Sequence, residues 1–289
     1  MASTDRVNYK GAAKTTALFS AVQIIKLAVG LIRNKFVAVL LGPEGMGIIG
    51  IYHTYAQFVQ SGAGLGLSQS AVRDVSEANG TDSRERFSRI ISLTNKLVLF
   101  TAVLGLVITI ILSPFFSQWG FGNYQYTLSF VILSLSVAGE IFVENRLSIL
   151  KGMRRMRSLA LTSIIGAVVG LLTSVPLFYF WGKDGIVPSL LVASFVSVLS
   201  TNYFVNKISY DKVNLTFKEI IHEGAPMLKM GIALMSINFL SNIFNVVVTS
   251  YLSRMGGMDV LGVYRAGHFL MVRSRSEERF SRNVETDIV

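Results

Sequence analysis

Residues 15–41 read TTALFSAVQIIKLAVGLIRNKFVAVLL, and the glycine-rich turn LGPEGMG at residues 41–47 leads into a second apolar run that ends at residue 71. A helix needs about 20 mostly apolar residues to cross the hydrocarbon core of a bilayer, and both runs are long enough. This stretch predicts two membrane-spanning helices joined by a short turn. The rest of the chain is organised around this hairpin.

The first run carries a polar stripe. At about 100° per residue, a set of polar and small residues falls on one side of the helix: Thr16, Ser20, Gln23, Lys26, Gly30, Arg33 and Asn34. A cation at the bilayer centre costs at least ~2.5 kcal/mol, so we expect the stripe to face a protein-lined or water-filled interior. The alternative is that Lys26 and Arg33 snorkel or pair with a carboxylate and only hold helices together.

Composition narrows the class of protein. Of the 289 residues, 51% are hydrophobic and 15% are charged, which is typical of a polytopic helical membrane protein. The formal net charge of +10 resides in short loops between apolar runs, so no nucleic-acid partner is expected. The absence of cysteine excludes disulfides and thiolate metal sites.

No constellation of residues supports catalysis. His53, His222 and His268 have no metal-ligand spacing, and no phosphate-binding glycine loop or serine triad is present. We therefore expect no enzyme, no metal and no cofactor.

Eight apolar runs follow one another, at residues 15–41, 47–71, 90–116, 126–150, 159–180, 186–205, 227–252 and, in shortened form, from 261. With the N-terminus in the cytoplasm, the inside segments hold 16 lysines and arginines and the outside loops hold two, Lys183 and Arg254. Short loops follow the positive-inside rule, so the N-terminus is predicted to be cytoplasmic. The first run is too long for the apolar part of a signal peptide and should remain as an anchor.

The sequence pattern of the opening hairpin recurs later in the chain. A glycine, a long apolar helix, a glycine-rich turn and Gly-x-Tyr occur in this order from Gly11 to Tyr52, with Gly50 opening the last motif, and again from Gly224 to Tyr264, with Gly262 opening it. Six spans separate the two starts, so both copies enter from the same side, as in a parallel repeat. We expect an all-α bundle with a six-helix lobe at residues 1–216 and the first hairpin of a second lobe at residues 217–272. Chance similarity between two apolar hairpins is the alternative.

The last segment, residues 273–289, reads RSRSEERFSRNVETDIV and interrupts the eighth run with charges. It resembles a translated sequencing adaptor joined to an incomplete reading frame. We expect it to be a non-native, disordered tail and exclude it from fold reasoning.

Three motifs carry a resemblance to a known family: LGPEGMG at residues 41–47, LKGMRRMRSLA at residues 150–160, and Gly-Ala-Pro at residues 224–226. Over residues 8–271 the chain resembles the O-antigen translocases, flippases of lipid-linked oligosaccharides in the superfamily that includes multidrug and toxin extruders. The resemblance implies two lobes around a cavity that opens alternately to either side of the bacterial inner membrane. It also implies an undecaprenyl-pyrophosphate-linked substrate, membrane lipids, and polysaccharide polymerase and ligase components as partners.

Candidate site residues lie on three helices. Lys26 and Arg33 would attract the pyrophosphate, and Gln23 shares their stripe. On the second helix His53, Gln57 and Gln60 form a face that could meet sugar hydroxyls or pack against another helix. On the fourth, Glu140 and Glu144 are candidates for ion coupling, although Glu144 could instead pair with Arg146 or Arg154.

Two rival functions remain. A multidrug and toxin extrusion-type antiporter is the rival within transport, and the cationic stripe suits an anionic headgroup better than a cationic drug. A non-transporting membrane scaffold is the rival from another class. It predicts that Lys26 and Arg33 tolerate apolar replacement, which a flippase would not.

Overall fold

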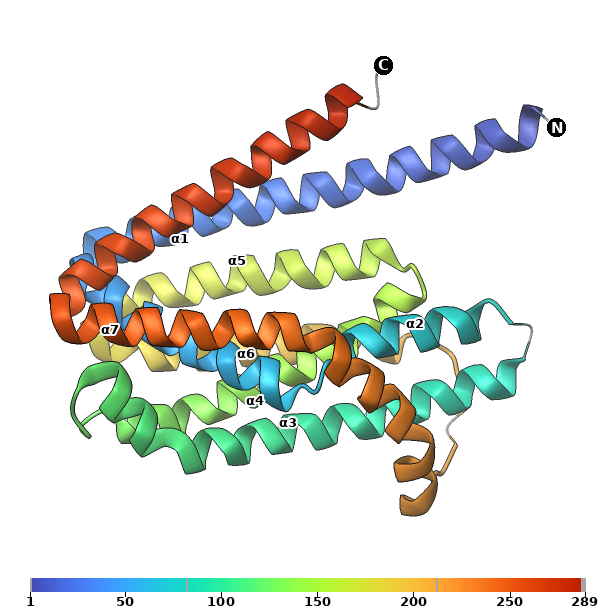
Figure 1. Ribbon diagram of the computed structural model, residues 1–289. Coiled ribbons are helices and arrows are strands. Elements are labelled where there is room, and N and C mark those ends of the chain that lie inside the picture. Colours follow the sequence, from blue (N-terminus) through green and yellow to red (C-terminus); the bar gives the residue numbers. More distant parts are fainter. Residues whose placement is uncertain (1, 82, 212, 287–289) are drawn as a thin grey trace.

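The computed structural model describes the backbone of residues 2–81, 83–211 and 213–286, and the side chains of residues 21–268 except 82, 212 and 217. All regular elements within these ranges are helices, so the prediction of an all-α fold is confirmed. In chain order they are α1 (Ala2–Ala63), α2 (Leu67–Asn79), α3 (Arg84–Phe121), α4 (Thr127–Gly152), α5 (Met156–Trp181), the 3-10 turn η1 (Gly182–Gly185), α6 (Ile186–Asn206) and α7 (Phe217–Thr286) (Figure 1).

Four stretches of the described chain are long and apolar enough to cross a membrane: Arg84–Phe121, Thr127–Gly152, Met156–Asn206, which contains both α5 and α6, and Lys218–His268. Large apolar side chains point outward from these helices, among them Ile111 (68% exposed) and Leu172 (65% exposed). Such surfaces suit lipid rather than water, and the chain is a multi-pass membrane protein. The predicted first span begins among residues whose side chains lie outside those described.

Helices α1 and α7 are each two helices joined at a glycine. Gly42 interrupts α1 with φ 67° and ψ −171°, and Gly257 interrupts α7 with φ 77° and ψ 176°. A positive φ is accessible to glycine at little cost, which explains why both predicted turns contain this residue. The two breaks lie at the same end of the bundle in Figure 1, where α1 and α7 both reverse direction.

The two hairpins contact each other reciprocally at these breaks. A Cβ on Gly47 would collide with the carbonyl oxygen of Met258, and a Cβ on Gly262 would collide with that of Pro43. One offset of 215 residues relates Gly42 to Gly257, Pro43 to Met258 and Gly47 to Gly262. A two-fold relation between the hairpins would produce this exchange of contacts. The sequence comparison, which paired Gly50 with Gly262, is therefore displaced by three residues here, and the division into lobes stays a prediction.

The second predicted run, residues 47–71, is not one helix. α1 ends at Ala63, and α2 begins at Leu67 after Leu65 and Gly66 adopt left-handed conformations with φ 50° and 61°. At this break the backbone of Gly66 passes so close to that of Gly231 that a Cβ on either residue would collide with the other segment. The prediction of a continuous helix was wrong because this contact with α7 is invisible in the local sequence.

From the break at Gly42 onward, α1 runs antiparallel to the first part of α7. Tyr55 Oη lies 2.7 Å from Ser250 Oγ, the rings of Phe58 and Phe239 stack at 5.4 Å, and Gly66 meets Gly231. As residue numbers rise from Tyr55 on α1 to Gly66 just after it, those of their partners fall along α7. The two segments thus form one wall of the bundle.

An aromatic cluster fixes α1 to α3 and α4. The ring of Tyr55 lies 4.8 Å from that of Phe116 on α3, and the ring of Tyr52 lies 5.2 Å from that of Phe130 on α4. All four side chains are at most 2% exposed. Large buried aromatic surfaces dominate core energetics, so this cluster holds the wall in place.

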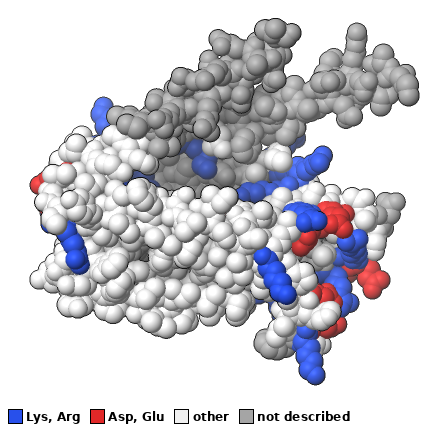
Figure 2. All heavy atoms as spheres, viewed as in Figure 1, with Lys and Arg blue, Asp and Glu red and all other residues white. Residues whose placement is uncertain are grey.

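Charged side chains gather at the end of the molecule opposite the glycine breaks (Figure 2). At that end Arg89 of α3 forms ion pairs with Glu219 at 3.0 Å and Glu223 at 2.5 Å, both on α7, and Arg84 pairs with Asp211 at 3.2 Å. The assignment of this end to the cytoplasm stays a prediction from the positive-inside rule.

After the break at Gly257 the helical backbone of α7 continues to Thr286, so it passes through most of the segment expected to be a disordered tail. Side chains from residue 269 onward, and the backbone of residues 287–289, lie outside the described residues. The foreign origin of residues 273–289 therefore stays a prediction.

Candidate functional site

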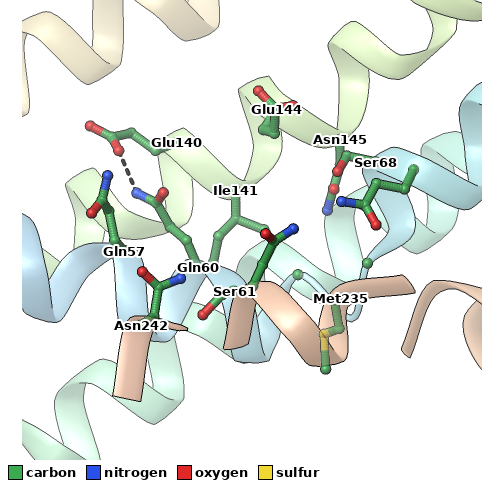
Figure 3. A pocket seen from close by; sticks show the side chains of 14 residues that line it. Gln57, Gln60, Ser61, Ser68, Glu140, Ile141, Glu144, Asn145, Met235 and Asn242 are labelled. Carbon is green, nitrogen blue, oxygen red and sulfur yellow. Dashed lines mark hydrogen bonds between the residues drawn. The ribbon is translucent and has the colours of Figure 1, made fainter. Parts of the chain in front are cut away.

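A polar cavity of about 270 Å³ lies where α1, α2, α4 and α7 meet (Figure 3). Its lining is rich in amides and hydroxyls and consists of Gln57, Gln60, Ser61, Gly64, Gly66, Ser68, Gln69, Glu140, Ile141, Glu144, Asn145, Met235, Asn238 and Asn242. Among these lining residues there is no lysine, arginine or aromatic ring. The cavity therefore offers neutral hydrogen-bonding groups and two carboxyl groups.

The side chains that α1 contributes to the cavity lie on one face of the helix. Gln60 and Ser61 follow Gln57 by three and four residues, so these side chains share one face of α1, and Gly64 follows directly after the helix ends. Gln60 Nε2 donates a hydrogen bond to Glu140 Oε2 across to α4, as the dashed line in Figure 3 marks. The structure thus brings Glu140, which the sequence suggested separately, to the face that carries Gln57 and Gln60.

Glu144 also lines the cavity, one turn after Glu140. Its Oε1 lies 2.7 Å from Lys151 Nζ on the same helix, so the expected pairing with Arg146 or Arg154 is replaced by a pairing with Lys151. Arg146 instead donates to Asn206 Oδ1 at 2.6 Å and lies over the ring of Phe142. Glu144 is therefore neutralised locally, while Glu140 interacts with a neutral amide.

Gln23, Lys26 and Arg33 of the polar stripe lie outside the cavity lining. On the first part of α1, Gln23 and Lys26 are exposed and Arg33 is half-buried. Arg33 lies near enough to Glu140 for their charges to interact. The structure therefore connects Arg33 to the cavity through Glu140 and places Lys26 two turns further along the helix.

His53 is exposed and lies near Arg33 and Arg265, outside the cavity lining. Arg265, on the second part of α7, is a cation that sequence reasoning missed. Its Nη2 donates to Gly50 O at 3.2 Å, to Thr249 Oγ1 at 2.9 Å and to Thr54 Oγ1. These acceptors are all neutral, so Arg265 adds positive charge to the Arg33 side of the site.

The polar residues that α7 contributes to the cavity were also not identified from the sequence. Asn238 and Asn242 are one turn apart, and Asn245 and Thr249 continue the same helical face. This spacing was readable in the sequence as a polar stripe. Ser68 and Gln69 of α2 could not be found in this way, because they depend on the helix break at Gly66.

Beyond the cavity, toward the glycine breaks, α7 packs against α3. Ser253 Oγ donates to Gly120 O at 2.6 Å, and Arg254 Nη2 donates to Gln118 O at 2.8 Å. Thr54 and Thr249 are buried between α1 and α7. In the described chain no group of three or more His, Cys, Asp or Glu side chains could hold a metal ion.

Comparison with known proteins gives relatives over most of the chain. Residues 12–273 match the family described as "Polysaccharide biosynthesis protein". The chain is 26% identical over 187 residues to the Lipid III flippases of Escherichia coli (strain K12) and Shigella flexneri, a match covering 62% of this chain and 44% of each relative. The chain thus spans less than half the length of these curated relatives.

Two solved structures share the fold. An inward-facing multidrug resistance transporter of the MATE family in the MOP superfamily gives a TM-score of 0.62 at 16% identity, covering 84% of this chain and 59% of that one. The MATE multidrug transporter DinF-BH in complex with R6G gives 0.65 at 17% identity, covering 87% and 58%. The matched span, the helical bundle and the transporter fold agree, and the chain belongs to the polysaccharide biosynthesis protein family.

Proposed function

We propose that this protein is a flippase that moves an undecaprenyl-pyrophosphate-linked O-antigen, or another polysaccharide repeat unit, from the cytoplasmic to the periplasmic leaflet of the bacterial inner membrane. It would serve lipopolysaccharide or other surface polysaccharide biosynthesis, with its N-terminus in the cytoplasm. The observation that carries the proposal is the polar cavity between α1, α2, α4 and α7 inside an apolar bundle, with Arg33 beside it. Family membership and the 26% identity to Lipid III flippases support it.

The cations on α1 provide the headgroup chemistry. Lys26 and Arg33 are seven residues apart, which places them on one helix face about 10 Å apart along the axis. A pyrophosphate cannot enter lipid without neutralisation, and a fixed cation in a partly dry cavity attracts it more strongly than in water. Gln23 extends the polar face, and His53 and Arg265 lie on the Arg33 side of the cavity.

Glu140 is the residue for which we propose ion coupling. It contacts Gln60 and lies near Arg33, so a change in its protonation would alter the charge that the substrate meets. Glu144 is a weaker choice because Lys151 neutralises it. Polysaccharide polymerase and ligase components are the proposed protein partners.

A multidrug and toxin extrusion-type antiporter is the second candidate, because the solved structures of similar fold are multidrug transporters. The cations beside the cavity favour an anionic substrate over a cationic drug. A non-transporting scaffold leaves the polar cavity without a role.

The test is restoration of surface glycan in a flippase-deficient strain by the full-length transporter carrying Lys26→Ala or Arg33→Ala. We expect each to reduce restoration at least about ten-fold, the scale of one lost hydrogen bond to a charged group. Arg33→Lys should be milder, because lysine retains the charge without the bidentate geometry. Lys35→Ala, an exposed cation on the same helix, is the control. Full restoration by both alanine variants at normal membrane abundance would favour the scaffold.

A further inference from the structure

The cavity and the cationic stripe differ in chemistry. Each is therefore suited to a different part of the substrate. Among the lining residues there is no lysine or arginine, whereas Arg33 and Arg265 lie outside it. A pyrophosphate placed in the cavity would meet Glu140 and Glu144 without a cation in the lining. The headgroup therefore belongs beside Arg33, and the cavity is left for a different, uncharged group.

The amides of the cavity are available to a ligand. Of the six lining amides, Gln60 donates to Glu140 and Asn145 donates to Thr101 Oγ1 at 2.9 Å. With other described residues the amides of Gln57, Gln69, Asn238 and Asn242 form no hydrogen bonds. Each can both donate and accept, which matches the hydroxyl groups of a sugar.

The cavity also has an apolar part, and its volume is small. Ile141 and Met235 offer contact to the C–H face of a ring. The volume of about 270 Å³ lies below the ~300–1,000 Å³ of pockets for drug-sized ligands and corresponds to about nine waters of ~30 Å³ each. That space suits one sugar ring.

We propose that this cavity binds one neutral sugar ring of the lipid-linked glycan, with Asn238 and Asn242 of α7 facing Gln57 and Gln60 of α1 across it. The inference rests on the proposed function and adds to it the class of sugar. The carboxylate of Glu140, whose hydrogen-bond partner is the neutral amide of Gln60, disfavours an acidic sugar by like-charge repulsion and can accept a hydrogen bond from a neutral hydroxyl. Because α7 supplies one wall, the ring is held only while α7 stays packed against α1.

The experiment uses the purified full-length transporter in nanodiscs and isothermal titration with three probes: farnesyl pyrophosphate, farnesyl-pyrophosphoryl-glucose and farnesyl-pyrophosphoryl-glucuronate. We expect the glucose probe to bind at least about ten-fold more tightly than the sugar-free probe, and the glucuronate probe to lose that gain. In the Asn238→Leu/Asn242→Leu variant the glucose probe should weaken about thirty-fold, as for two ordinary hydrogen bonds, while the sugar-free probe changes less than about two-fold.

Ser241→Leu is the matched control, because Ser241 lies next to Asn242 outside the lining and its hydroxyl donates to Ile237 O on its own helix. It should leave all three affinities unchanged. If glucose adds no affinity, or if the double variant weakens the sugar-free and glucose probes equally, the sugar subsite is overturned while the flippase proposal stands. Equal binding of glucose and glucuronate probes overturns the neutral class. If the unmodified protein binds none of the probes, both proposals fail.

Discussion

The contact between Gly66 and Gly231 allows a quantitative prediction of stability. Two effects would act on a substitution there, the left-handed backbone conformation and the crowding of the new Cβ, and the chain contains a comparison glycine for each effect. Gly66 combines a left-handed conformation, φ 61°, with a Cβ position that collides with the backbone of Gly231. Gly122 has the same kind of conformation, φ 74°, and nothing within 4 Å of its Cβ position. Gly231 is helical and crowded by Leu65 and Gly66, and Gly267 is helical and open.

The expected changes in the free energy of unfolding follow from these environments. Gly267→Ala should be neutral or stabilising by up to ~1 kcal/mol, since alanine favours a helix. Gly122→Ala should cost ~1–2 kcal/mol for the left-handed backbone alone. Crowding against backbone adds ~1–3 kcal/mol. Gly231→Ala should therefore be destabilising relative to Gly267→Ala, and Gly66→Ala should cost ~2–5 kcal/mol.

The assay is thermal unfolding of the purified protein in one detergent at one scan rate. At ~2–4 °C per kcal/mol, Gly66→Ala should lower Tm by about 4 °C or more and always by more than Gly122→Ala. Equal Tm values for Gly66→Ala and Gly122→Ala, together with equal values for Gly231→Ala and Gly267→Ala, would refute the close approach of α7 to the helix break.

In this cysteine-free chain, Ser83→Cys at the arginine-rich end should resist an impermeant thiol reagent in intact cells, and Gly122→Cys at the opposite end should be labelled. The reverse pattern would invert the predicted topology. Tyr55→Phe removes the hydroxyl 2.7 Å from Ser250 Oγ and should lower the free energy of unfolding by ~1 kcal/mol, because Ser250 still donates to Val246 O. The exposed Tyr124→Phe should have no effect in the same unfolding assay, and equal losses for the two variants would contradict this assignment.

Much of the fold could be predicted, because apolar length and glycine-rich turns are local signals. The turn at Gly42 and the helices that follow residue 84 lie where the apolar runs place them. The break at Gly66 could not, since its cause is the backbone of Gly231, 165 residues away. The register of the repeat was displaced because glycines recur every few residues in both turns, so several alignments fit equally well.

Only part of the candidate site could be predicted, because only part of it is visible in local sequence patterns. Gln57, Gln60 and Glu140 stand out as polar residues in apolar helices, but their meeting depends on how α1 packs against α4. Asn238 and Asn242 were readable as one helical face and were missed. Lys151 is seven residues from Glu144, two turns along one helix, a partner that a search restricted to arginines passes over.

The helix break and the cavity are parts of one arrangement. Because α1 ends at Ala63, the first turn of α2 starts beside the cavity and contributes Ser68 and Gln69 to it. Asn238 follows Gly231 by seven residues, so the close contact at Gly66 places Asn238 about 10 Å further along α7, opposite the Gln57 and Gln60 face. A side chain at Gly66 would push α7 outward and separate the two cavity walls. Gly66→Ala should therefore weaken binding of the glucose probe as well as lower Tm, whereas Gly122→Ala should lower Tm alone. Unchanged glucose affinity in a Gly66→Ala protein that remains folded would show that the cavity does not depend on this contact.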